Sequence, residues 1–196
     1  DLYRRLGGFS AMRFGEDIDF SIRIFKSGAS CRLFPEAWVW HKRRTDMKKF
    51  FKQVHNSGIA RINLLKRHPG SMKPVHLLPA LFTAGMACLA LLFVAGLVLV
   101  GANLYGIHGM SGTGADDHML HVGVLLGCIA IACSLVPPAL YSILIFFDSL
   151  FKNRSFKVAS LSVVAAAVQI TGYGMGFLKA FWYKMILKQP LETKEN

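Results

Sequence analysis

The feature that most constrains this fold is a long stretch without basic residues. No Lys or Arg occurs from residue 75 to residue 151, although the chain carries 23 of them and 53% of its 196 residues are hydrophobic. A helix needs about 20 apolar residues to cross a bilayer. Three apolar runs in the sequence are that long, and they lie near 75–100, 121–147 and 158–177. The sequence therefore predicts a region of two to three transmembrane helices over 75–188.

Charge divides the chain and predicts its orientation. Residues 1–74 hold 16 Lys or Arg against 6 Asp or Glu, a net charge of +10. By the positive-inside rule this segment and the 148–157 loop are expected to be cytoplasmic, with the 101–120 loop outside. A third full crossing would put Lys179, Lys184 and Lys188 outside, so the third run either crosses or lies partly in the interface. Pro137-Pro138 is expected to kink or break the second helix.

An acidic helix start is the first chemical feature. Glu16, Asp17 and Asp19 follow Gly15, and the positive end of a helix dipole keeps such carboxylates ionised. The apolar spacing after them predicts one buried helix face, with Gly28 as C-cap. The residues of that face are Ile18, Ile22 and Phe25. Taken alone, the acids fit a capped surface helix as well as a catalytic site.

The segments around this helix carry a resemblance. Gly7-Gly8-Phe9 precedes it, and Trp38-Val39-Trp40-His41 follows, which reads as a short strand. With the Gly-Glu-Asp-x-Asp helix, residues 1–70 resemble the C-terminal part of a family 2 glycosyltransferase of the α/β GT-A fold. The resemblance implies that Asp17 is the general base, with Glu16 and Asp19 orienting it. Asp19 is the main rival for the base role.

The same resemblance implies a divalent cation, Mg²⁺ or Mn²⁺, with His41 as one ligand. The other ligands and the nucleotide-binding strands would then precede Asp1. A lone histidine is also common as a structural or surface residue, and both interpretations of His41 stay open at this point.

A basic amphipathic helix is expected from Thr45 or Asp46 to about Arg67. Its apolar side and its lysines fit a helix on an anionic membrane surface. Within it, Gln53 and Arg61 resemble the family's element that binds the substrate and the leaving diphosphate. Asn56 stands where processive relatives carry Arg, so processive polymerisation is not expected.

The predicted organisation has four parts. Residues 1–44 are the C-terminal part of a GT-A domain, 45–74 an interfacial helix, 75–188 the transmembrane region and 189–196 a disordered tail. The four cysteines have no framework spacing and are expected to be small hydrophobic residues rather than disulfides or zinc ligands.

The expected protein is a multi-pass enzyme of the inner (plasma) membrane with a cytoplasmic catalytic part. It would transfer a sugar, with inversion, from a nucleotide-sugar donor to a lipid-linked or saccharide acceptor. Nucleic acid is not expected as a partner, because the basic residues adjoin membrane spans. Two alternatives are a non-catalytic membrane scaffold that retains a glycosyltransferase remnant, and a small transporter component.

Overall fold

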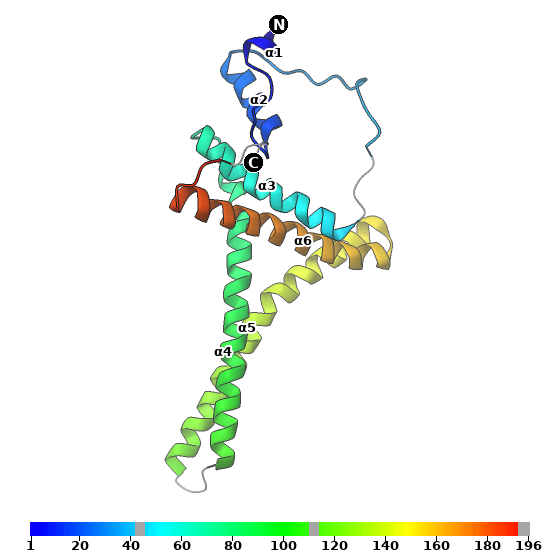
Figure 1. Cartoon of the computed structure of the whole chain (residues 1–196). Helices are drawn as coiled ribbons and strands as arrows, with labels where there is room; N and C mark the ends of the chain where they lie inside the picture. The colour runs from blue at the N-terminus through cyan, green and yellow to red at the C-terminus, as the bar shows by residue number, and fades with distance from the viewer. Residues whose placement is uncertain (42–45, 110–113, 192–196) are drawn as a thin grey trace. The chain divides into compact units, whose positions relative to one another are not determined.

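A computed structural model describes residues 1–41, 46–109 and 114–191 of the chain, with side chains from 106 to 117 left aside. Over these residues the protein is helical (Figure 1). The elements are α1 (Leu2–Arg5), α2 (Glu16–Lys26), α3 (Met47–Arg67), a 3₁₀ turn (Pro74–His76), α4 (Leu78–Gly109), α5 (Gly114–Asn153), α6 (Phe156–Phe181) and a π-helical turn (Trp182–Ile186).

The described residues contain no β-strand, so the expected α/β layer of a GT-A domain is not seen in them. The strand expected at 38–41 is wrong for this structure. Its residues are exposed, and no neighbouring strand pairs with them. A strand is stabilised by the strand that pairs with it, so a short apolar run without such a partner forms only an irregular segment.

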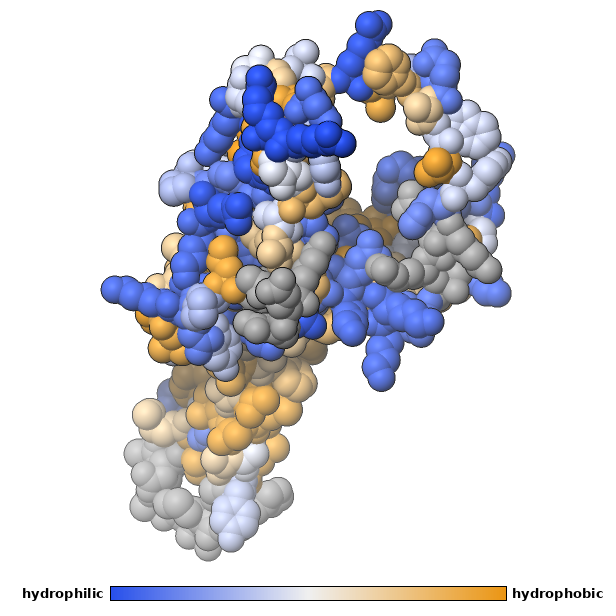
Figure 2. Space-filling model, turned by 45° about the horizontal axis from the view of Figure 1, so that its top comes forward, coloured by the Kyte–Doolittle hydropathy of each residue, from blue (hydrophilic) through white to orange (hydrophobic). Residues whose placement is uncertain are grey.

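The chain divides into two compact units, which are described separately. Unit 1 comprises Asp1–Phe82 and Ala167–Asn196, and unit 2 comprises Thr83–Ala166. Figure 2 shows hydrophilic side chains over much of unit 1 and hydrophobic side chains over the long helices. The core of unit 1 joins α3 with the start of α4 and the end of α6, and its buried members are Ile59, Ile62, Ala80, Phe177 and Ala180.

Helix α3 has the start and end that its sequence predicts. The Asp46 carboxylate caps it by accepting hydrogen bonds from the backbone N–H groups of Lys48 and Lys49, at 2.7 and 3.4 Å. Thr45, the other expected cap, lies outside the described residues. The helix ends at Arg67, where Lys66 and Arg67 complement the negative end of the dipole.

Glycines let α3 and α6 approach closely within unit 1. A Cβ added to Gly58 would meet the Tyr173 carbonyl oxygen and would lie 2.7 Å from the Phe177 nitrogen. One added to Gly176 would meet the His55 carbonyl oxygen. Since both obstacles are backbone atoms, no side-chain rotation relieves them. Small residues at such crossings permit backbone contact between helices.

Among the described residues, three helices are long and apolar enough to cross a membrane: Pro74–Tyr105, His118–Asn153 and Phe156–Ile186. Within unit 2, α4 and α5 meet at Gly96 and Gly127, where a Cβ on either would lie 2.9 Å from the other's carbonyl oxygen. Helix α5 runs through Pro137 and Pro138 without interruption, so the prolines do not break it.

The short helix α2 differs from expectation in the face that it buries. Ile18 and Ile22 are half-buried, but Phe25 is 61% exposed and the fully buried side chain is Asp19. The prediction that Phe25 is buried is therefore wrong. Ser27 is the C-cap, and Gly28 follows it with a left-handed φ of 79°.

Candidate functional site

The acidic helix start is positioned by Gly15. This residue is the N-cap of α2 and has a φ of 86°, in the left-handed region that favours glycine. A Cβ there would lie 3.2 Å from the Ala60 Cβ of α3. Glycine thus satisfies both the turn and the close approach, and the first turn of α2 begins directly over α3.

An open pocket of about 370 Å³ lies where α2 begins, and all of its walls belong to unit 1. It is called the acidic pocket below. Its lining comes from the segment before α2, from the first turn of α2, from α3 and from α6, and consists of Arg13, Phe14, Gly15, Glu16, Asp17, Ile18, Asn56, Ser57, Ala60, Arg61 and Tyr173.

Three of the residues singled out in the sequence meet in this pocket. Glu16 and Asp17 come from α2, and Arg61 comes from α3. The Arg61 guanidinium lies against the Tyr173 hydroxyl, which places its charge at the α6 wall. In such a pocket a carboxylate can accept a proton from a bound hydroxyl group. The guanidinium can stabilise the negative charge of a bound anion.

Asp19 has a different environment. Its side chain is fully buried and accepts hydrogen bonds from Arg23 Nε at 3.0 Å and His68 Nε2 at 2.8 Å. Arg67 Nε forms an ion pair with the same carboxylate at 2.8 Å. Arg23 in turn donates to the carbonyl oxygens of Leu6 and Gly8. The Asp19 cluster, formed by Asp19, Arg23, Arg67 and His68, therefore ties the turn at 7–8 and α2 to the end of α3.

The charge state of Asp19 follows from these contacts. Burial alone would raise the pKa of the carboxyl group, but the hydrogen bonds from His68 and Arg23 and the charge of Arg67 outweigh burial and lower the pKa. Asp19 is thus ionised at neutral pH and saturated with donors. It does not line the acidic pocket, and this placement favours an anchoring role over the base role.

Gln53 and His41 lie apart from the acidic pocket. Gln53 is exposed on α3, and His41 is exposed at the end of an irregular segment. Neither residue lines the pocket. Within the described ranges no group of three or more His, Cys, Asp and Glu side chains could hold a metal ion. The role of His41 as a ligand of a divalent cation therefore stays a prediction.

Two residues that line the acidic pocket, Tyr173 and Asn56, are not predicted as site residues by the sequence. Tyr173 stands in an apolar run, so its place in the pocket depends on how α6 packs along α3; the glycines on either side of it were the available signal. Asn56 was noted only as a departure from a pattern, but it lines the pocket beside Ser57.

The comparisons with known proteins are limited in extent. No family model matches the chain, and no solved structure matches it. The chain is 34% identical over 73 residues to the pre-mycofactocin glycosyltransferase of Mycobacterium tuberculosis strain CDC 1551 / Oshkosh, and to the protein of that name from strain H37Rv. The match covers 37% of this chain and 16% of the length of each relative. The chain thus has a distant, partial similarity to a glycosyltransferase and carries three helices of membrane-spanning length.

Proposed function

We propose that this chain forms the acceptor side of a membrane-bound glycosyltransferase. The observation that carries the proposal is the acidic pocket, in which Asp17 and Arg61 face one space from two helices. The partial similarity to a glycosyltransferase and the apolar helices agree with it. The donor would be a nucleotide-sugar, and the acceptor a lipid-linked or membrane-proximal saccharide.

In the proposed reaction Asp17 acts as the general base. Its carboxylate takes the proton from an acceptor hydroxyl while that oxygen attacks the anomeric carbon of the sugar. The bond from the anomeric carbon to the diphosphate breaks at the same time, so a single displacement inverts the configuration. Asp17 is exposed at the helix start, as a base that receives a soluble or lipid-borne hydroxyl must be. Glu16 beside it would orient the acceptor.

Arg61 has the complementary role in this proposal. A fixed cation stabilises the negative charge that develops on the leaving diphosphate. Contact with Tyr173 holds the guanidinium at one wall, so little reorganisation is needed during the reaction. The apolar helices would keep the pocket at the cytoplasmic face of the inner membrane, which raises the local concentration of a lipid-borne acceptor.

The test is sugar transfer by membranes that contain the intact protein. Asp17→Asn keeps the size of the side chain and removes its basicity, so turnover should fall at least a hundredfold. Asp148→Asn is the matched control, since Asp148 is an exposed acid paired with Lys152 in unit 2, and it should transfer sugar at the wild-type rate.

A control measurement separates chemistry from folding. Asp17→Asn should match the wild type in membrane insertion and in binding of the nucleotide-sugar. If this variant keeps more than about a tenth of wild-type turnover, Asp17 is not the base. The scaffold alternative would be supported if the wild-type protein itself transferred no sugar.

A further inference from the structure

We infer that the second half of α6 lies in the membrane surface, with an exposed apolar face docked on one leaflet, and does not cross the bilayer. This half, residues 167–181, and the π-helical turn that follows it belong to unit 1. Length and composition alone make Phe156–Ile186 a candidate span. The packing of α6 against α3 distinguishes a surface helix from a crossing one.

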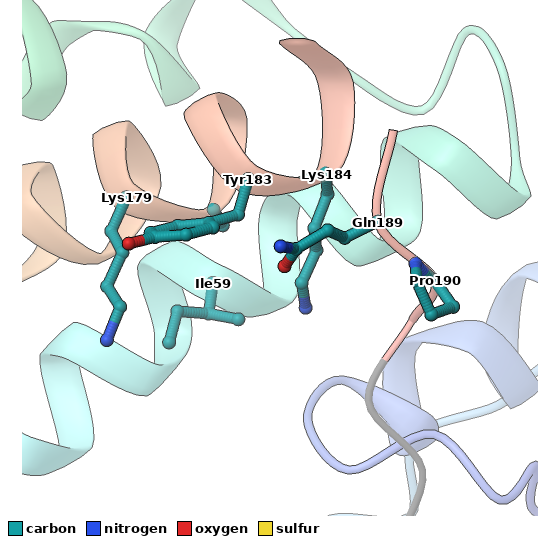
Figure 3. Close-up of a pocket in the computed structure, with 7 residues that line it drawn as sticks. Ile59, Lys179, Tyr183, Lys184, Gln189 and Pro190 are labelled. Carbon is teal, nitrogen blue, oxygen red and sulfur yellow. The ribbon is translucent and has the colours of Figure 1, made fainter. Parts of the chain in front are cut away.

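Helix α6 follows α3 in parallel for several turns. The contacts advance together along both helices, from Gly172 near Phe51, through Gly176 near His55, to Gln189 near Lys66. Figure 3 shows the last turns of α6 beside α3, with Lys179 and Lys184 directed toward the helix that carries Ile59. From Phe51 to Lys66 a helix is about 22 Å long. Over this length the two helices must therefore have nearly the same inclination to the membrane.

Helix α3 is unsuited to the interior of a bilayer. Exposed basic side chains occur near both of its ends, and they are Lys48, Lys49, Lys52, Lys66 and Arg67. Charged side chains at the centre of a bilayer are costly. If the second half of α6 crossed the membrane at a steep angle, α3 would carry these cations into the hydrocarbon. The pair of helices therefore fits the surface of a membrane and not its interior.

One face of this part of α6 is apolar and exposed. Its side chains recur at helical spacing and form the apolar stripe, which consists of Met175, Leu178, Trp182, Met185 and Ile186. The other face places Phe177 and Ala180 in the core of unit 1. A helix with one face packed on protein and an exposed apolar face on the other side is typical of a membrane interface.

Two observations identify lipid as the occupant of the apolar stripe. Ala80 of α4 shares the buried cluster with Phe177 and Ala180, and the candidate span Pro74–Tyr105 has only just begun at that residue. A span begins at the level of the lipid headgroups, so this part of α6 lies at the same level. Trp182 is 55% exposed in the stripe, and tryptophan side chains collect at that level. An interfacial helix buries its apolar face about 5–10 Å into the leaflet, which is the depth expected for the stripe.

The depth of spin labels in a bilayer tests this inference on the full chain, reconstituted into vesicles of phosphatidylcholine and phosphatidylglycerol. The native cysteines are first replaced, and one exposed residue at a time is then changed and labelled: Met175→Cys, Leu178→Cys, Trp182→Cys or Met185→Cys. Relaxation by oxygen and by a water-soluble nickel complex gives the depth of each label. All four labels should lie at nearly the same depth, whereas a crossing helix would change depth by about 15 Å from Met175 to Met185.

Labels on two other helices are the matched controls. Leu81 and Leu91 are exposed on α4 and have the same separation in sequence as Met175 and Met185. Labels at Leu81→Cys and Leu91→Cys should therefore differ in depth by about 15 Å, as expected for a crossing helix. Lys52 is exposed on α3, and a label at Lys52→Cys should be freely accessible to the nickel complex in water.

Three results would overturn the inference. A depth that changes steadily from Met175 to Met185 would show that this part of α6 crosses the bilayer. Free access of the nickel complex to all four labels of the stripe would show that the stripe faces water. Dipolar broadening between labels on neighbouring molecules would show that a second copy of the chain covers the stripe. Sugar transfer does not enter the measurement, so the result is independent of the proposed catalysis.

Discussion

Asp17 and Asp19 are two positions apart on one helix and have opposite environments. Residues at i and i+2 on a helix do not face each other, so a single turn presents one carboxylate to the acidic pocket and the other to the interior. The interior carboxylate meets Arg67 and His68, which are 48 and 49 positions further along the chain. The sequence places three acids together, but only these distant partners distinguish an anchor from a candidate base.

Removing the anchor charge should destabilise unit 1. Asp19→Asn leaves Arg23 and Arg67 with a weaker acceptor, and breaking a buried ion pair typically costs about 3 kcal/mol. Urea unfolding of the detergent-solubilised chain, followed by tryptophan fluorescence, measures the difference at pH 7. Glu36→Gln, a change at an exposed acid in the irregular segment, should leave the unfolding midpoint unchanged.

The difference in unfolding free energy between the wild type and Asp19→Asn should depend on pH. The pKa of Asp19 is lower in the folded state, so its stabilisation is fully present above the unfolded pKa of about 3.9 and is lost as the pH falls toward the folded value. The gap in unfolding free energy between wild type and Asp19→Asn should therefore be constant from pH 7 to about pH 5 and narrow below about pH 4. A gap that widened with acidification would contradict the assignment of an ionised Asp19.

At the scale of the elements, the crossing of α3 and α6 depends on glycine. Gly58→Ala and Gly176→Ala each place a methyl group against backbone atoms of the other helix, and overpacking of this kind costs about 1–3 kcal/mol. Thermal unfolding in detergent micelles should show both variants melting below the wild type. Gly85→Ala is the control, because a Cβ there meets nothing within 4 Å and the helix gains propensity. Equal melting of all three would mean that the helices do not touch at this crossing.

Local signals predicted the helices well and the site only in part. The cap at Asp46 and the end at Arg67 follow from nearby residues, as does the acidic start of α2. Tyr173 joins Arg61 across more than a hundred positions, and no periodicity reports such a contact. The strand expected at 38–41 is wrong for a related reason, because a strand depends on contacts that are distant in the sequence. A short apolar and aromatic run such as Trp38-Val39-Trp40 is typical of a strand, but its pairing partner must come from elsewhere in the molecule.

For the whole molecule, the contacts of Lys66 make a prediction about topology. The end of α3 is bound to Gln189, so both belong on the same side of the membrane. A cysteine at Thr193, which lies outside the described residues, should therefore react with an impermeant thiol reagent only after permeabilisation, as should one at Ser71. A cysteine at Ser111, also outside the described residues, should react from outside, because the loop around it lacks basic residues.

Removing the native cysteines makes this labelling interpretable. All four are free thiols, so their replacement by Ser or Ala breaks no disulfide. Labelling at Thr193 from outside would show that the segment after residue 156 crosses fully, and labelling at Ser71 from outside would reverse the whole arrangement.

The Asp19 cluster has a mechanical consequence. The cluster connects α2 to the last turn of α3. The carboxylates of Glu16 and Asp17 on α2 and the guanidinium of Arg61 on α3 therefore move together as one rigid body. The distance between these carboxylates and the guanidinium is then constant. In the proposed reaction, the entry of substrates and the release of products would then depend on motion of the parts that face α2 and α3, and not on motion of Asp17 relative to Arg61.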